Sequence, residues 1–193
     1  MSRHDLFGLR LPLLSMKELV IFPRNIVTLF IGKPRSVQAV EEALVTDQRL
    51  VITMQRTGGP DDGSPDSVHR VGTLVEIVSF ERRDPSGIQI VLEGISRVRL
   101  SQIDPSGQVA TAAVERLAEV TPDPVEAEAM LRVIKDLTIR YRDDKGVPSS
   151  EVLDMVKRAS APGQLADLLA TQLLAGTDEG KALERQALLE QVD

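Results

Sequence analysis

The tetrapeptide Asp-Pro-Ser-Gly occurs twice in this 193-residue chain, at residues 84–87 and 104–107. In a turn, the Asp accepts backbone N–H bonds, the Pro fixes φ, and the Gly takes the left-handed conformation of a bulge. The flanking segments, residues 68–83, 88–100 and 108–120, are rich in strand-forming residues. Two such turns between three strands predict an antiparallel β-meander. Gly94, inside the second strand, predicts a bend or bulge.

The residues before this meander carry further strand signals. Residues 9–14 form a short apolar run that contains Pro12, which predicts an edge strand because proline cannot donate to a ladder. Residues 26–31 and 49–54 are rich in β-branched residues and predict two more strands. Between them, apolar residues recur at helical spacing over residues 35–46, which predicts an amphipathic helix.

The pattern changes at Thr121-Pro122, after which the periodicity is helical. A helix is expected over residues 124–142, with one apolar face. That face comprises Met130, Val133, Ile134, Leu137 and Tyr141. Shorter helices are expected to begin near Ser149 or Ser150, near residues 160–163, and at residue 179. The sequence therefore predicts an α+β fold, with a β-rich lobe at residues 1–120 and an α-helical bundle lobe at residues 121–193.

Composition and motifs exclude several functions. The chain has no cysteine, which excludes disulfides and Cys-ligated zinc. It contains no Walker A motif and no nucleophile elbow, and its two histidines, His4 and His69, lack a second histidine at metal spacing. We therefore expect no catalytic, cofactor-binding or metal-binding residues. The net charge of −6 opposes nucleic acid as the main partner.

No apolar run reaches the ~18 residues that would suggest a membrane span. Residues 1–8 are polar and lack the apolar stretch of a signal peptide. We therefore expect a cytoplasmic protein with no membrane partner.

Motifs spread over almost the whole chain resemble the amino-terminal, substrate-binding domain of the Lon ATP-dependent proteases. The similar segments, in order, are 11–14, 18–23 (ELVIFP), 29–32 (LFIG), 36–55, 70–73 (RVGT), 91–98 (VLEGISRV), 162–167 (PGQLAD) and 187–190 (ALLE). Their order and spacing carry the resemblance, since no single segment is decisive. The sequence departs from the family pattern at Ser15-Met16, Arg24 and Thr28, near the expected surface or edge of the β lobe, which puts its partner contacts in question.

The resemblance implies a PUA-like β-barrel or β-sheet lobe and a helical lobe that leads to a linker helix and an AAA+ motor. The motor, which uses ATP and Mg²⁺, and the Ser-Lys protease site are expected beyond residue 193, so this segment is expected to have no enzymatic activity. The implied function is substrate recognition and assembly in a cytosolic hexameric serine protease that degrades misfolded and regulatory proteins. The implied partners are unfolded or degron-bearing proteins and other subunits of the hexamer.

A surface that accepts many clients should be apolar and adaptable. Candidate client-binding residues lie in the segment around a Pro-containing turn, in the following strand and on the helices: Phe22, Pro23, Arg24, Ile26, Phe30, Met130 and Met155. The competing interpretation places Phe22, Ile26, Met130 and Met155 in the core, where most such residues lie. Leu29 and Phe30 are adjacent in a strand, so one should face inward and the other outward.

Two other functions stay open at the level of sequence. One is a stand-alone module of the Lon-domain type, which would bind a specific protein or small ligand through the β lobe. The other is an RNA-binding PUA-like module, which the negative charge opposes.

Overall fold

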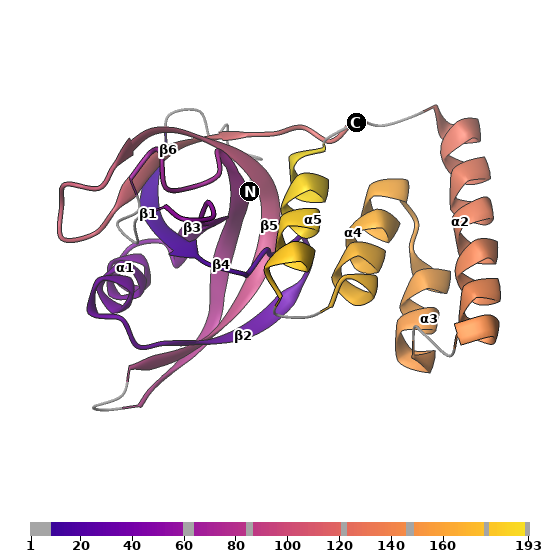
Figure 1. Ribbon diagram of the computed structural model, residues 1–193, viewed down its shortest axis with the longest axis horizontal. Coiled ribbons are helices and arrows are strands. Elements are labelled where there is room, and N and C mark those ends of the chain that lie inside the picture. Colours follow the sequence, from indigo (N-terminus) through magenta and orange to yellow (C-terminus); the bar gives the residue numbers. More distant parts are fainter. Residues whose placement is uncertain are drawn as a thin grey trace. The chain divides into compact units, whose positions relative to one another are not determined.

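The computed structural model describes residues 9–59, 64–83, 87–120, 123–145, 149–175 and 178–191, without the side chains of residues 142–145. The chain divides into two compact units. The first, Met1–Ala118, is called the β unit, and the second, Glu119–Asp193, is called the helical unit. Figure 1 shows their elements. The α+β class predicted from the sequence is confirmed, with six strands in one mixed sheet and five helices among the described residues.

The β unit has a sheet in which five of the six described strands are paired in a closed ring. Its elements are β1 (Leu9–Met16), β2 (Ile26–Ile31), α1 (Pro34–Val45), β3 (Arg49–Met54), β4 (Val71–Arg82), β5 (Ile88–Asp104) and β6 (Thr111–Arg116). The sheet order is β2-β5-β4-β3-β1-β6, and β6 also pairs with β5. The meander β4-β5-β6 is antiparallel throughout, as the two turns predicted. Within the described chain, β2 lies outside the ring and pairs with β5 alone.

The strand that contains Pro12 is not an edge strand, so that prediction is wrong. Residues 9–12 of β1 pair antiparallel with β6, and residues 13–16 pair parallel with β3. Pro12 lies where β1 changes partners, just before the pairing with β3 begins. A residue without an N–H is tolerated there because no ladder bond to β3 is needed yet.

The second Asp-Pro-Ser-Gly segment folds only partly as predicted. The carboxylate of Asp104 accepts hydrogen bonds from the Ser106 backbone N–H at 3.0 Å and from its hydroxyl at 2.6 Å. These bonds lower the pKa of Asp104. The prediction of a left-handed Gly107 is wrong, because the positive φ in this part of the ladder falls at Gln102, where the β5–β6 register shifts. In the first segment, Gly87 has a φ of 131°, while residues 84–86 lie outside the described part.

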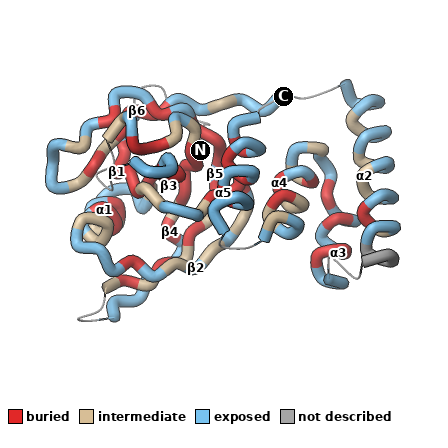
Figure 2. The backbone as a smooth tube through the Cα atoms, in the orientation of Figure 1, coloured by how far each residue is buried: buried red, intermediate tan, exposed pale blue. Residues whose placement is uncertain are grey.

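Two apolar clusters fill the β unit. In one cluster, each of the five ring strands contributes a buried side chain; examples are Leu11, Val51, Leu74, Val98 and Val114. The other cluster packs helix α1 against the sheet and includes Val40 and Ala43, which are fully buried. Figure 2 shows the buried backbone along β3, β4 and β5 and the more exposed backbone along β2.

The helical unit consists of α2 (Pro124–Lys145), α3 (Ser150–Arg158), α4 (Pro162–Leu173) and α5 (Glu179–Glu190). A small core joins the first three helices, with Val156 and Leu165 fully buried against Leu131 and Ile134 of α2. The Lys135 ammonium donates to the Lys157 and Ala159 carbonyls at 2.9 and 2.7 Å, so a positive charge lies at the carboxyl end of α3. Ser149 is the residue before α3, as predicted, but its side chain makes no capping bond. None of the described helices is both long and apolar enough to span a membrane.

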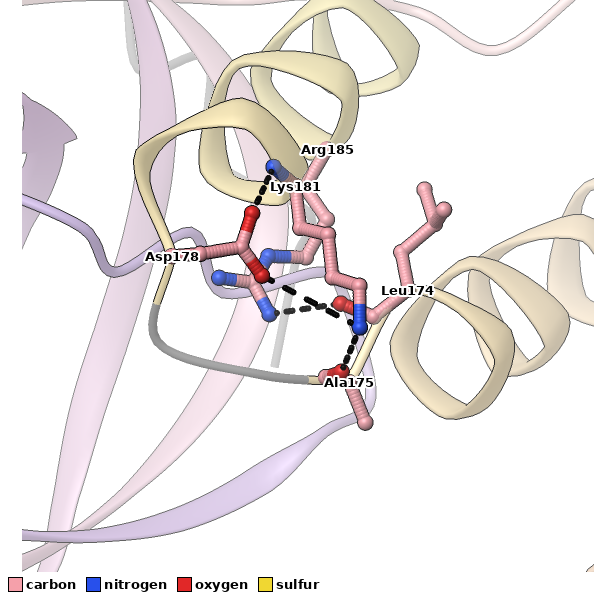
Figure 3. A network of polar contacts seen from close by, with 5 residues as sticks. All are labelled: Leu174, Ala175, Asp178, Lys181 and Arg185. Carbon is pink, nitrogen blue, oxygen red and sulfur yellow. Dashed lines mark hydrogen bonds and ion pairs between the residues drawn. The ribbon is translucent and has the colours of Figure 1, made fainter.

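The last two helices are joined by the polar network of Figure 3. Asp178 caps α5 by accepting from the Lys181 backbone N–H at 2.9 Å. The Lys181 ammonium donates to the Ala175 carbonyl at 3.1 Å, and the Arg185 guanidinium donates to the Leu174 carbonyl at 3.0 Å. Two cations of α5 therefore satisfy carbonyls at the end of α4 that have no partner within that helix. These bonds connect the first turns of α5 to the end of α4.

A close approach in the β unit gives the first prediction. A Cβ atom at Gly94 would lie 2.3 Å from the Phe22 carbonyl oxygen, so Gly94→Ala must displace a backbone segment. We expect the free energy of unfolding of the β unit to fall by about 2 kcal/mol or more, measured by urea denaturation with circular dichroism. The control is Gly58→Asn, since an added Cβ there meets nothing within 4 Å and Asn tolerates a positive φ. An equal loss of stability in both variants would contradict this explanation.

Candidate functional site

The segment that precedes β2 is a tight turn held against β5. The Arg24 backbone N–H donates to the Gly94 carbonyl at 2.7 Å, and the Gly94 N–H donates to the Asn25 carbonyl at 2.9 Å. The Asn25 N–H closes the turn on the Phe22 carbonyl at 3.2 Å. Arg24 has a φ of 68°, the left-handed region that a non-glycine residue rarely adopts. The turn therefore fixes where β2 begins and in which direction its first side chains point.

Phe22 and Pro23 are buried, so they are removed from the candidate client-binding residues. Phe22 has an exposed fraction of 1%, and the Arg97 guanidinium lies 5.8 Å from the centre of its ring, at cation–π distance. Next to it, the Thr73 hydroxyl donates to the Ile21 carbonyl. The core interpretation of Phe22 is therefore confirmed. The physical reason is that the apolar run from Val20 to Phe22 lies across the sheet at Gly94, where the missing side chain leaves room for it.

Beyond this turn, the side chains of β2 alternate between core and solvent. Ile31 is buried at 3%, and Val27 and Leu29 are partly buried against the α1 cluster. Ile26 and Phe30 are 67% and 56% exposed, and Thr28 between them is also exposed. The core interpretation of Ile26 is therefore wrong, and the inward–outward alternation expected for Leu29 and Phe30 is confirmed. We call Arg24, Ile26, Thr28 and Phe30 the β2 face.

The β2 face lies in a positively charged stretch of an acidic protein. Residues 24–40 contain Arg24, Lys33 and Arg35 but no Asp or Glu, whereas the whole chain has 29 acids and 23 bases. Arg35 is partly buried and donates to the Pro105 carbonyl. The paired segment of β5 adds one acid, Glu93 opposite Ile26, so bases still outnumber acids beside β2, which favours neutral or acidic partners over basic ones.

The two methionines proposed as client-binding residues lie in the helical unit. Met130 on α2 is 45% exposed and Met155 on α3 is 56% exposed, so neither is in the core. The predicted apolar face of α2 is divided: Ile134 packs toward α3 and α4, whereas Val133, Leu137 and Tyr141 are exposed like Met130. The reason is that Leu131, which the periodicity left out, supplies the packed face instead.

Among the exposed apolar residues of the β unit that the sequence reasoning missed are two neighbours on β4. Val78 and Phe80 on β4 are 58% and 52% exposed, beside the register shift between Ile77 and Ser79. The shift adds one residue to β4, so the regular alternation of inward-facing and outward-facing side chains is interrupted there. No pattern in the sequence marks this bulge.

The geometry places Ile26 and Phe30 on β2, with Arg24 in the turn just before it, while Met130 and Met155 belong to the other unit. Residues 10–193 match the family model described as the ATP-dependent protease La (LON) substrate-binding domain. The chain belongs to this Lon family. The resemblance noted in the sequence is thereby confirmed.

Similar full-length proteins are Lon proteases, of which this chain corresponds to a small part. The Lon protease of Desulfovibrio desulfuricans is 32% identical over 174 residues, which cover 90% of this chain and 20% of that protein. The Lon protease of Lawsonia intracellularis is 32% identical over 175 residues, again 90% of this chain and 21% of that protein. The chain therefore spans about a fifth of the length of these relatives.

Two solved structures share the fold. The N-terminal domain of a Lon protease from the Mycobacterium avium complex has a TM-score of 0.74 at 19% identity, over 95% of this chain and 91% of that one. A Lon N-terminal domain protein from Xanthomonas campestris has a TM-score of 0.60 at 20% identity and the same coverage. The chain thus has the fold of Lon N-terminal domains.

The contrast between Phe22 and Ile26 gives the second prediction. We expect Phe22→Ala to lower the free energy of unfolding by about 3 kcal/mol or more, because it leaves a cavity under the sheet. Ile26→Ser, on the exposed side of β2, should cost about 1 kcal/mol or less. Urea denaturation followed by circular dichroism measures both. A larger loss for Ile26→Ser than for Phe22→Ala would contradict the burial assigned to these side chains.

Proposed function

We propose that the β2 face is a client-binding surface of a Lon-type ATP-dependent protease and that it captures unfolded or degron-bearing proteins. The observation that carries this proposal is the exposure of Ile26 and Phe30 on a strand that the preceding turn holds in place. The family match to a substrate-binding domain supports a protein substrate.

The chemistry of the β2 face suits clients of varied sequence. Unfolded proteins have in common exposed apolar side chains and an unpaired backbone. Two large apolar side chains on a strand that the sheet holds in place can contact the exposed apolar side chains of a client without a specific polar pocket. Arg24 adds a cation at one end, which favours client segments that carry an acid near their apolar residues.

The parent protein is proposed to be a cytoplasmic, hexameric AAA+ serine protease of protein quality control. Its ATP, Mg²⁺ and Ser-Lys site would belong to segments other than this one, whose described residues contain no cluster of three metal-ligating side chains. The β lobe (residues 1–120) is proposed to be a PUA-like barrel that binds clients, and the strand pairing in a closed ring supports it. The helical lobe (residues 121–193), with exposed Met130 and Met155, is proposed to contribute a second client contact and to lead to the linker helix and motor.

The third prediction tests the β2 face with reduced, carboxymethylated α-lactalbumin, a permanently unfolded protein. We expect the double variant Ile26→Ser/Phe30→Ser to bind it about tenfold or more weakly, because each apolar side chain that it removes contributes about 1 kcal/mol or more when covered by a client. Isothermal titration calorimetry measures the affinity.

The matched control is Val45→Ser, which removes an apolar side chain that is 83% exposed at the end of α1 rather than on β2. It should bind as the parent chain does. Equal weakening by both changes would indicate nonspecific apolar contact, and unchanged binding by the double variant would exclude the β2 face.

A further inference from the structure

The free edge of β2 carries an inference that rests on the proposed function. Most edge strands are protected by charged residues, proline or a bulge, because an unpaired strand edge binds other chains. Residues 26–31, Ile-Val-Thr-Leu-Phe-Ile, contain no charge, no proline and no glycine. Their register with β5 is also regular, without a bulge. The strand is therefore an unprotected edge within the part of the chain that the structure describes.

The hydrogen-bond pattern shows which residues face that edge. The Gly94 N–H donates to the Asn25 carbonyl, one residue before the pair of Ile26 with Glu93, so Asn25 and Gly94 occupy a hydrogen-bonded position of the ladder, in which the Gly94 carbonyl accepts from the Arg24 N–H instead. In an antiparallel ladder such pairs alternate with non-hydrogen-bonded ones. Val27, Leu29 and Ile31 therefore direct their backbone groups toward β5. Ile26, Thr28 and Phe30 direct theirs away from β5.

The same three residues thus present both backbone and side chains to a partner. Ile26, Thr28 and Phe30 are the exposed residues of β2, and their N–H and C=O groups point to the open edge. An extended segment that paired with this edge would gain main-chain hydrogen bonds that do not depend on its sequence. Its alternate side chains would lie beside Ile26 and Phe30.

We propose that clients bind to this domain by adding a strand to the free edge of β2. The occupant is an extended stretch of unfolded polypeptide with alternating apolar residues and neutral or acidic residues between them. The neutral or acidic residues are expected because bases outnumber acids beside β2: residues 24–40 hold three bases and no acid, and the paired residues 88–93 of β5 add one acid, Glu93. Main-chain pairing explains how one surface accepts many sequences, and the apolar side chains select segments that a folded protein would bury.

The decisive variant is Thr28→Pro. Residue 28 belongs to a non-hydrogen-bonded pair with Val91 of β5, so its N–H is not needed inside the sheet. Proline is tolerated at such an edge position, yet it removes the donor that an added strand requires. Ile26 and Phe30 are unchanged. Thr28→Val keeps the donor and is the matched control.

The probe is a short acetylated, fluorescein-labelled peptide in which valine alternates with threonine or aspartate, and binding to the full chain is measured by fluorescence anisotropy. Two further peptides carry N-methyl groups on the valine amides only or on the intervening amides only. In an added strand of either direction, only one of these sets faces β2. We expect methylation of one set to abolish binding and methylation of the other to leave it unchanged.

We expect Thr28→Pro to bind the unmethylated peptide about tenfold or more weakly than Thr28→Val does, because only the proline variant lacks the backbone donor. Circular dichroism and thermal unfolding of each variant establish that it is folded. If Thr28→Pro unfolds the chain, the methylated peptides still decide the question with the parent protein. Equal effects of the two methylated sets would overturn the proposal.

Two other results would indicate a different partner at the β2 edge or a different mode of client binding. If Thr28→Pro retains the peptide and the unfolded lactalbumin while Ile26→Ser/Phe30→Ser loses both, clients bind through side chains alone. The proposed function then stands and strand addition fails. If the chain self-associates in sedimentation without peptide and Thr28→Pro abolishes this, the edge belongs to a second copy, which also overturns the proposal.

Discussion

The β unit depends on a single long strand, β5, that serves three partners. Its first half pairs with β2 on one side and β4 on the other, and its second half pairs with β4 and then β6. Each backbone group of β5 can bond to only one partner strand, so the pairing of β2, β4 and β6 must begin and end at defined residues of β5. Gly94 lies near the end of the β2 pairing, and the space above it is taken by the Phe22 carbonyl. The position of β2, and therefore of the candidate site, follows from this crossing.

Local pattern was enough to predict most elements. The strand at residues 26–31, the strand at residues 49–54 and the helix after Lys33 lie where the periodicity placed them. The antiparallel meander also followed from its two turns. These elements could be predicted because each one depends on neighbours in the chain: a proline at the helix start, a β-branched run, or an Asp that bonds to the residue two positions later.

The features that could not be predicted depend on partners distant in sequence. Pro12 predicts an edge strand because a proline cannot donate to a ladder, yet β1 pairs with β6 up to this residue and with β3 after it. The sequence leaves Phe22 open between a client contact and a core residue, and only its position against Arg97 and Gly94 shows that it is buried. The helical periodicity leaves open whether Met130 is a client contact or a core residue, and only the packing of Leu131 against α3 and α4 shows that Met130 is exposed. Of the candidate site, the strand and its outward Phe30 could be predicted, whereas the exposure of Ile26 and the open edge required the sheet order.

The pairing of β1 with β6 has a consequence for biosynthesis. Leu9 lies opposite Val114, so the first strand of the β unit and the last one close the ring together. A ribosome that adds about 5–20 residues per second releases β1 several seconds before its partner exists. During that interval β1 can pair only with β3, so the nascent unit has one more open strand edge besides that of β2. The ring closes only after Arg116 has left the exit tunnel, so ribosome-associated chaperones would meet this domain in an open form.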